Sequence, residues 1–349
     1  MDAVALYEEA RARDTALAGF YNRNVRVEGD GGPFLVRIPG AETETMDLTL
    51  WPESALLEAI GPHLSPAPHA SPDPHMSPGP YALAPRLVHA NADPAFQIHE
   101  FVEGRRVDEL APDGKPLPEP VLDGIVRLLG ALLAVPVAAL PAVPADWPAD
   151  GDSPAFAERL LALVRAIRGR ADERVEGLYR ALGVPVDPCS RLARSADVVL
   201  VQRPFRLLHA DLHRKNMILT EGGQVVFLDW ELALWGDPVY ELADHLHKMA
   251  YTQADRQRVT AGWESAAPPE CLAGWREGLA FYLGYEEMKS AVVDTVRWAR
   301  RIAVAQGDRE RRILAAELHA KLLAAAPHWD GGAPPEPAGI EAAVAAWLG

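Results

Sequence analysis

The chain has 349 residues, of which 49% are hydrophobic and 24% are charged, values that are ordinary for a soluble globular protein. This length is enough to bury a large core, and it fits two packed lobes better than one simple domain. A formal net charge of -15 argues against nucleic acid or an anionic membrane as a partner, whereas cationic small molecules are compatible with it and so is a surface that only maintains solubility.

Two further features of the composition limit the cellular setting. No run of about 18 apolar residues is available to span a bilayer, and the acidic start MDAVALYEEA does not have the pattern of a signal peptide. Cys189 and Cys271 are the only cysteines, too few for a disulfide framework and without metal-ligand spacing. We therefore expect a cytoplasmic protein that is not attached to a membrane.

The N-terminal part of the chain predicts a helix followed by strands. The helix is expected over residues 3–15, and the alternating runs 25–28 and 34–38, joined by Gly-Asp-Gly-Gly, predict a hairpin. Residues 62–80 contain seven prolines with interspersed histidines, a composition that favours an extended surface loop. The apolar stretch 96–104 predicts a last strand that runs into the connection between two lobes.

The remainder of the chain has a mainly helical pattern. A Pro-rich linker at 136–154 ends in Asp152-Ser153-Pro154, which is a good helix start, and apolar residues recur at helical spacing over 155–182. Further helices are expected over 119–134, from Asp237-Pro238, from Pro269-Glu270, and over 291–302, 310–326 and 337–348.

The most informative segment is residues 207–251, LLHADLHRKNMILTEGGQVVFLDWELALWGDPVYELADHLHKMAY. It places His209, Asp211 and Asn216 on a short loop between two apolar runs, and it places Asp229 at the end of the second run. Asp and Asn are also common turn residues. The chain has only four asparagines, however, and one of them follows an Asp by five residues in the loop-and-strand context of a catalytic motif.

These residue types match the needs of phosphoryl transfer from ATP. The reaction requires positioning and charge neutralisation more than covalent participation by the protein. Asp211 is the candidate for orienting the attacking hydroxyl and accepting its proton. Asn216 and Asp229 are the candidates for holding Mg²⁺, which prefers hard oxygen ligands and keeps several waters.

With these residues in view, the chain resembles the aminoglycoside phosphotransferase and choline kinase superfamily. HADLHRKN is similar to that superfamily's HGDLHPGN loop, and FLDWELALWGDPVYELA is similar to its metal-site segment and the helix start that follows. Arg214 and Lys215 stand where the superfamily usually has Pro and Gly. The resemblance implies a bilobal, protein-kinase-like α+β fold, with a small nucleotide-covering lobe at 1–105 and a larger, mainly helical lobe at 106–349 that carries the catalytic and substrate-binding residues.

The resemblance also implies a nucleotide site in the small lobe. Gly19, Asn22 and Asn24 look like a GxTN-type version of the loop that cradles phosphates, although a simple turn is an alternative. Arg37, in a RIPG string similar to the choline-kinase side of the superfamily, occupies the position of the phosphate-binding lysine. Its expected partner is Glu53 on the next helix; a surface salt bridge is the alternative for this glutamate.

Two other sites follow from the same comparison. The backbone from Glu100 to Val102 is expected to hold adenine at the hinge. Acceptor recognition is expected to use acids behind the catalytic loop, with Trp235, Tyr285 or Trp298 available for cation–π contacts. A solvated helix face is the alternative for each acid. The candidate acceptor-binding acids are Glu231, Glu241, Glu286 and Glu287.

The basic residues of the catalytic loop have two interpretations. Arg214 and Lys215 would neutralise the transferring phosphoryl group if they point into the site, or they would point outward as variable residues. His209 and His213 are expected to organise the loop through hydrogen bonds rather than to act as bases.

We therefore predict an ATP- and Mg²⁺-dependent kinase that phosphorylates a hydroxyl of a small, cationic acceptor. An antibiotic-modifying phosphotransferase is favoured, and a metabolic choline- or ethanolamine-type kinase, or a sugar or nucleoside kinase, is the alternative. A nucleotide-binding pseudokinase that regulates a partner is the alternative from another class. The acceptor itself, the preference for ATP over GTP, the oligomeric state and any protein partners are not predicted.

Overall fold

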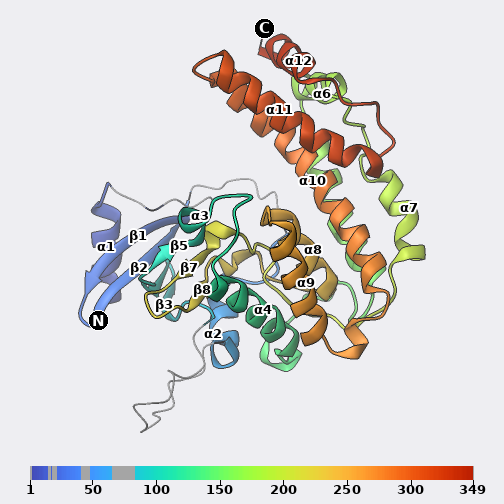
Figure 1. The fold of residues 1–349 in the computed structure, drawn as a ribbon. Coiled ribbons are helices and arrows are strands. Elements are labelled where there is room, and N and C mark those ends of the chain that lie inside the picture. Colours follow the sequence, from blue (N-terminus) through green and yellow to red (C-terminus); the bar gives the residue numbers. More distant parts are fainter. Residues whose placement is uncertain (1, 15–16, 18–21, 41–47, 65–82, 349) are drawn as a thin grey trace. The chain divides into compact units, whose positions relative to one another are not determined.

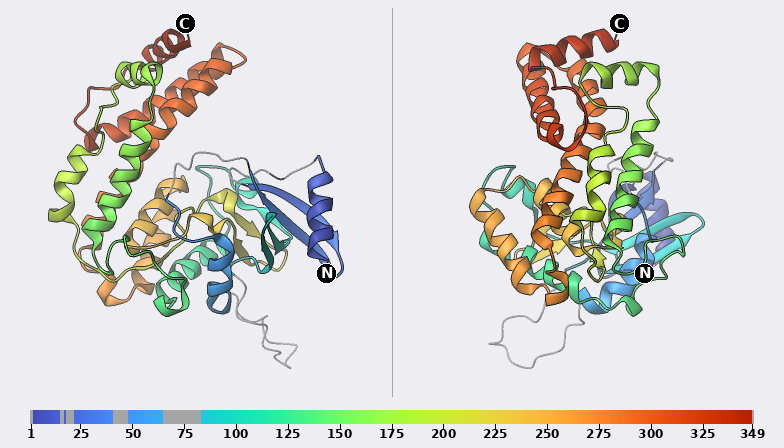
Figure 2. Two further views of the ribbon diagram at one scale, coloured as in Figure 1. Left: turned by 180° about the vertical axis from the view of Figure 1, so that it is seen from behind. Right: turned by 90° about the vertical axis from the view of Figure 1, so that its right-hand side faces the viewer.

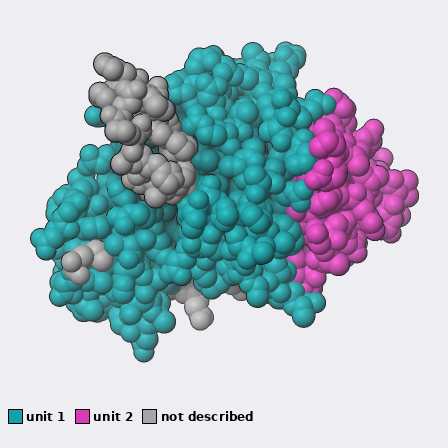
Figure 3. All heavy atoms as spheres, turned by 90° about the horizontal axis from the view of Figure 1, so that it is seen from below, with its two compact units in different colours: residues 1–145, 206–235, 248–268 teal, residues 146–205, 236–247, 269–349 magenta. Residues whose placement is uncertain are grey.

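The structure, a computed structural model, describes residues 2–14, 17, 22–40, 48–64 and 83–348. These form two compact units, which are coloured separately in Figure 3. The first unit comprises residues 1–145, 206–235 and 248–268, and the second comprises residues 146–205, 236–247 and 269–349. The predicted lobe boundary at residue 105 falls inside the first unit, and the division at that point stays a prediction.

The first unit begins with a helix and a four-stranded antiparallel sheet, which lie side by side in Figures 1 and 2. The strands are in the order β1-β2-β4-β3. The predicted hairpin is confirmed, because β1 and β2 pair from Val25↔Val36 to Gly29↔Gly32 and Gly31 takes the left-handed φ of 103° that this turn requires. The elements are α1 (Ala3–Ala12), β1 (Asn22–Gly29), β2 (Gly32–Pro39), β3 (Leu87–Ala92) and β4 (Ala95–Glu100).

Alternation along the strands gives this sheet two different faces. Successive side chains of a strand point to opposite sides, so Phe34 and Val36 lie on one face of β2 while Leu35 and Arg37 lie on the other. The first face packs against α1 in an apolar core in which the rings of Tyr7 and Phe96 stack at 4.5 Å. The second face is therefore left free to line a site.

The rest of the first unit surrounds the catalytic segment with short strands and helices. A second antiparallel sheet has the order β5-β7-β8, and a third pairs β6 with β9. The elements are α2 (Glu53–Leu64), β5 (Arg105–Arg106), α3 (Val107–Leu110), α4 (Glu119–Ala134), η1 (Val137–Ala139), β6 (Arg206–Leu208), η2 (Arg214–Asn216), β7 (Met217–Leu219), β8 (Val225–Phe227), η3 (Trp230–Leu232), β9 (Leu234–Gly236) and α9 (Gln253–Ala266).

The second unit is built from helices. The buried Asp237 precedes the helix α8: its Oδ1 accepts the backbone N–H of Val239 at 3.0 Å, and its carboxylate pairs with Arg203 at 3.0 Å. The helices are α5 (Ser153–Gly169), α6 (Glu173–Ala181), α7 (Ser190–Val199), α8 (Pro238–Lys248), η4 (Pro269–Cys271), α10 (Trp275–Val304), α11 (Asp308–Ala325), η5 (Ala326–His328) and α12 (Pro337–Leu348).

The predicted α+β class is confirmed, and the differences concern element boundaries. The predicted helix over 155–182 is two helices, because Asp172 caps a new helix by accepting the N–H of Val175 at 2.8 Å. The helix expected from Pro269 is one 3-10 turn, and α10 then runs unbroken through the predicted 291–302 helix. The helix α2 includes Pro62 and continues to Leu64, whereas most of the predicted 62–80 loop lies outside the described residues.

No helix that the structure describes is both long enough and apolar enough to cross a bilayer.

Close packing of α4 against β8 gives a first testable prediction. A Cβ at Gly124 would lie 2.8 Å from Val225 Cβ, whereas one at Gly130 in the same helix would make an ordinary 3.4 Å contact with Ala266. We expect Gly124→Ala to lower the free energy of unfolding by about 1–3 kcal/mol through overpacking. Gly130→Ala should raise it by about 0.5–1 kcal/mol because alanine favours helix. Urea unfolding of the two variants checks this, and equal stabilisation by both would contradict it.

Candidate active site

The loop HADLHRKN connects β6 to β7 and has an unusual backbone. The described residues include three non-glycine positions with left-handed φ, and they are Ala210 (59°), Asp229 (68°) and Ala250 (46°). Such conformations cost roughly 1–3 kcal/mol each and persist where surrounding contacts enforce them. All three lie in this loop or in segments that contact it. The backbone therefore marks the same region that the sequence motif predicts.

His209 fixes the start of the loop, as expected from the sequence. Its ring is fully buried 4.5 Å from the ring of Trp230, and its Nε2 lies 3.0 Å from the carbonyl oxygen of Leu228. Because a carbonyl only accepts, Nε2 carries the proton. Burial lowers the pKa of His209 to about 4, so the ring is neutral near pH 7 and acts as a structural hydrogen-bond donor.

The carboxylate of Asp211 is held from two sides. Lys248 Nζ lies 2.8 Å from Asp211 Oδ1, and the amide nitrogen of Asn216 donates to Oδ2 at 2.9 Å and to the Asp211 carbonyl at 3.1 Å. Burial raises the pKa of Asp211, but Lys248 and His213 more than offset that effect, so the net shift is downward. The group is an oriented carboxylate, suited to accept a hydrogen bond from a hydroxyl.

The two predicted metal ligands lie at one cavity. Asn216 Nδ2 is turned toward Asp211, which leaves the Asn216 amide oxygen as the donor atom available to a ligand. Asp229 follows β8 and also lines the cavity, with its carboxylate 31% exposed. One amide oxygen and one carboxylate form a hard-oxygen donor set, which fits Mg²⁺.

Arg37 sits at the centre of a buried charge cluster. Its Nη2 lies 2.7 Å from Asp229, 3.3 Å from Glu53, and 3.4 Å from Glu231. Burial lowers the pKa of Arg37, but the carboxylates raise it and the net shift is upward. The ion pair with Glu53 is the one expected from the sequence, and Glu53 Oε1 also accepts the N–H of Trp230 at 3.1 Å.

Glu231 belongs to the same cluster. It accepts a hydrogen bond from Asn22 Nδ2 at 2.6 Å in addition to its contact with Arg37. Burial, followed by the charge of Asp229, raises the pKa of Glu231 to about 8. Glu231, a predicted acceptor-binding residue, therefore contacts Asn22 and Arg37 within the protein, and Arg37 also contacts the metal-ligand candidate Asp229.

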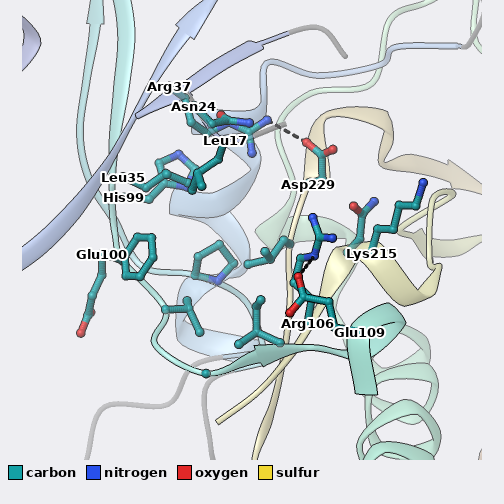
Figure 4. A pocket seen from close by; sticks show the side chains of 17 residues that line it. Leu17, Asn24, Leu35, Arg37, His99, Glu100, Arg106, Glu109, Lys215 and Asp229 are labelled. Carbon is teal, nitrogen blue, oxygen red and sulfur yellow. Dashed lines mark hydrogen bonds and ion pairs between the residues drawn. The ribbon is translucent and has the colours of Figure 1, made fainter. Parts of the chain in front are cut away.

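The second face of the sheet and the catalytic segment enclose a cavity of about 330 Å³, shown in Figure 4. Arg37 and Asp229 point toward one another at one end, joined by their ion pair. Asn24, the backbone region from Glu100 to Val102, and Asn216 also line it. The cavity brings together most of the predicted nucleotide-site residues, whereas Gly19 lies outside the described part of the chain. Its volume suits a small ligand.

The hinge candidates, Glu100 to Val102, all line the cavity. The side chain of Glu100 pairs with Arg86 at 3.0 Å and is exposed. The N–H of Glu100 donates to the carbonyl of Arg86 at 2.9 Å, and that of Phe101 to the carbonyl of Pro33 at 3.2 Å. The exposed Glu100 carboxylate is therefore engaged by Arg86, and adenine binding by the backbone of this segment stays a prediction.

The two cations of the catalytic loop differ sharply in their surroundings. Arg214 is 2% exposed and donates to five backbone carbonyls at 2.6–3.3 Å, so neither predicted interpretation describes it. It braces the loop from inside the protein. Lys215 is exposed and lines the cavity, where Figure 4 shows its side chain.

The remaining candidate acceptor residues lie in the second unit. Glu241 and Glu286 are only 3% and 1% exposed, so they are not a solvated helix face. Lys289 Nζ lies 2.8 Å from Glu286 Oε1, and Glu287 pairs with His328 at 2.8 Å. Glu286 is therefore an interior ion-pair partner of the helical unit, whereas Glu287 is 35% exposed.

Sequence reasoning missed Lys248, which is the cation on Asp211. Its place at the end of α8 gives no motif, since the residue lies 37 positions from its partner. The one available signal was composition: only five of the 34 Lys and Arg residues are lysines.

Comparison with known families agrees with this geometry. A model of the phosphotransferase enzyme family, abbreviated APH, matches residues 15–291. That span is most of the chain, and the chain belongs to this family. No curated protein matches it significantly.

Solved structures share the fold at low identity. The choline kinase LicA from Streptococcus pneumoniae is 14% identical, with a TM-score of 0.51 over 88% of this chain and 92% of that one. A choline/ethanolamine kinase family protein from Mesorhizobium loti is 14% identical, with a TM-score of 0.52 and full coverage of both chains. The aminoglycoside phosphotransferase APH(4)-Ia with ADP and hygromycin B has a TM-score of 0.49 at 14% identity over 93% and 99%. The choline and choline/ethanolamine kinases establish the protein-kinase-like fold for this chain.

The contrast between the two loop cations gives a second prediction. Arg214→Met removes the donor from several buried carbonyls, and we expect the free energy of unfolding to fall by about 3 kcal/mol. Lys215→Met, the matched control one residue away, should change it by less than about 0.5 kcal/mol because the side chain is at the surface. Denaturant unfolding with and without nucleotide measures both. Equal stability of the two variants would refute the bracing role of Arg214.

Proposed function

We propose that this phosphotransferase moves the terminal phosphoryl group of ATP to a hydroxyl of a small cationic acceptor. The observation that carries the proposal is the placement of Asp211, Asn216 and Asp229 on one loop and one strand end, with the last two at a cavity that Arg37 also lines. Positioned carboxylates, an amide and a cation are what phosphoryl transfer requires.

The nucleotide would occupy the cavity under the sheet. Adenine would contact the backbone near Glu100 and Val102, and the phosphates would extend toward Arg37 and Asn24. Asn216 and Asp229 would hold Mg²⁺, which when bound neutralises charge on the phosphates. Membership of a phosphotransferase enzyme family and the hard-oxygen donor set support this placement.

Asp211 would orient the acceptor hydroxyl and take its proton. Its carboxylate oxygens are held by Lys248 and Asn216, so its direction is set before the acceptor arrives. Each oxygen has two lone pairs and can accept a further hydrogen bond. A strongly ionised carboxylate is a weak base, which suits a loose transition state in which the hydroxyl is deprotonated late.

The charge of the protein supports a cationic acceptor. The net charge is -15, so an acceptor with ammonium groups would be attracted to the surface of the protein. The choline and choline/ethanolamine kinases among the similar structures are named for cationic alcohols, which agrees with this class.

Within that class we favour an acceptor with several primary ammonium groups, of the aminoglycoside type. A quaternary ammonium such as choline is usually bound over aromatic faces. Two of the aromatic candidates carry the protein's own cations: Lys289 lies 5.5 Å from the Tyr285 ring centre, and Arg301 lies 4.7 Å from that of Trp298. Carboxylates bind primary ammonium groups by hydrogen bonds and charge, and the net charge of -15 favours that mode of recognition.

The assigned roles of Asp211 and Asp229 separate in a paired experiment. Asp211→Asn should lower kcat by about 10²-fold or more while Mg-ATP affinity stays near wild type, because the residue acts on the acceptor. Asp229→Asn should weaken Mg²⁺-nucleotide binding and abolish turnover, because the anionic ligand is lost. Coupled ADP detection and calorimetry with and without Mg²⁺ measure the two effects. If wild-type protein releases no ADP with any acceptor, the proposed kinase function is wrong, and Mg-ATP binding without turnover would support the nucleotide-binding regulatory alternative.

Acceptor charge can be tested with chemically matched compounds. We expect an aminoglycoside to be phosphorylated with a KM at least tenfold lower than its fully N-acetylated form, which has the same hydroxyls but no ammonium groups. Its KM should also rise with ionic strength as attraction is screened. Nucleotide must be saturating throughout so that salt effects on Mg-ATP do not contribute. A neutral sugar or nucleoside as the best acceptor in the same panel would contradict the cationic class.

A further inference from the structure

Lys248 makes two contacts with the loop that carries the candidate base. Its ammonium donates to Asp211 Oδ1 at 2.8 Å and to the carbonyl oxygen of Ala210 at 3.0 Å. Its side chain is 21% exposed and that of Asp211 is 19% exposed, so water screens the pair only partly. One cation therefore ties the carboxylate of residue 211 to the strained peptide that precedes it.

The loop also contacts the backbone that follows Lys248. The two residues that follow it, Met249 and Ala250, accept hydrogen bonds at 2.9 and 3.3 Å from the buried guanidinium of Arg214, which belongs to the loop. The carbonyl of Ala250, itself in a left-handed conformation, also accepts the N–H of Gly114 at 2.9 Å. The segment 248–250 and the catalytic loop thus brace each other, and the position of the ammonium is set by buried contacts rather than by a flexible surface side chain.

The contacts leave a specific geometry at Asp211. Lys248 holds one carboxylate oxygen and Asn216 holds the other, so rotation of the carboxylate about its last bond breaks both hydrogen bonds. Lys248 does not line the cavity that would take the nucleotide, whereas Asn216 does. A contribution of Lys248 should therefore be felt at the acceptor hydroxyl more than in nucleotide affinity.

The residue type is itself informative. Lysine supplies three donors on a compact ammonium, whereas arginine supplies a planar fork that fits a carboxylate from one side. The chain uses arginine for most of its cations, with five lysines among 34 basic residues, and at position 248 it has a lysine whose compact ammonium reaches a carboxylate and a carbonyl together.

We propose that Lys248 is a positioning residue for the transfer reaction, which fixes the Asp211 carboxylate and the Ala210 peptide in the orientation that receives the acceptor hydroxyl. This inference rests on the proposed function of Asp211. Misplacement of a catalytic group by about 1 Å costs on the order of 10² in rate, which sets the scale of the effect.

The kinetic test compares Lys248→Met, Lys248→Arg and Lys115→Met. The first variant should lower kcat by about 10²-fold with a KM for Mg-ATP within about twofold of wild type. The second should recover part of kcat because it restores a cationic donor. Lys115 is an exposed lysine of the same unit, and its variant controls for the loss of one positive charge. Melting temperatures are measured in parallel, since a purely stabilising role would lower Tm and leave kcat at a lower temperature unchanged.

A second arm does not depend on turnover. Crystal structures of wild type and Lys248→Met should show the Asp211 carboxylate rotated, or Ala210 relaxed from its left-handed φ, in the variant alone. The inference is overturned if neither the Asp211 carboxylate nor the Ala210 peptide changes, or if kcat stays within about twofold of wild type. A rise in the KM for Mg-ATP at constant kcat also overturns it, because the ammonium would then serve the nucleotide. If wild type phosphorylates no acceptor in the panel, the proposed function fails, and the crystallographic arm still decides whether Lys248 positions Asp211.

Discussion

A single buried guanidinium, that of Arg37, connects the elements that form the site. It comes from β2 and contacts carboxylates from α2 and from the segment after β8. Removing these charges from water is costly, and the cost is recovered only if the geometry is good and further hydrogen bonds are made. Trp230 and Asn22 provide such bonds to Glu53 and Glu231. The sheet and the catalytic segment are thereby held at a defined distance, which keeps the cavity open between them.

The charge balance of this cluster explains its chemistry. One guanidinium faces Glu53, Asp229 and Glu231, so full ionisation would leave an excess of two negative charges. The protein alone responds by raising the pKa of Glu231 to about 8, first through burial and then through Asp229. A divalent cation at Asp229 would supply the missing charge and favour the ionised cluster. The same electrostatics would make metal binding and proton release from this cluster thermodynamically linked.

Local sequence predicted the positions of the HADLHRKN loop and of the strand before Asp229 because both are encoded at short range. Asp211, Asn216 and Asp229 lie within 19 residues, and each is placed by the strand or loop in which it occurs. The alternation of β2 likewise predicts that Arg37 and Val36 face opposite ways. Contacts across long sequence separations could not be predicted in this way. From the sequence alone Arg214 is a cation of the loop, and only the folded chain shows that its guanidinium donates to carbonyls of residues near 111 and 249. The same limit applies to Lys248. It also applies to residues 155–182, where the apolar periodicity predicts one helix but Asp172 caps a second one.

Two cations thus serve opposite ends of the proposed reaction with different side chains. Arg37 is shared among three carboxylates, and a fork of donors suits that task better than a point charge. Lys248 serves one carboxylate and one carbonyl, which a compact ammonium reaches together. Exchanging the two residue types would leave the net charge unchanged while altering both geometries. The site therefore depends on where its charges lie rather than on how many there are. The left-handed backbone at Ala210 and Asp229 is strained, and the surrounding hydrogen bonds and ion pairs offset that strain while they hold the candidate base and the metal-ligand candidate in place.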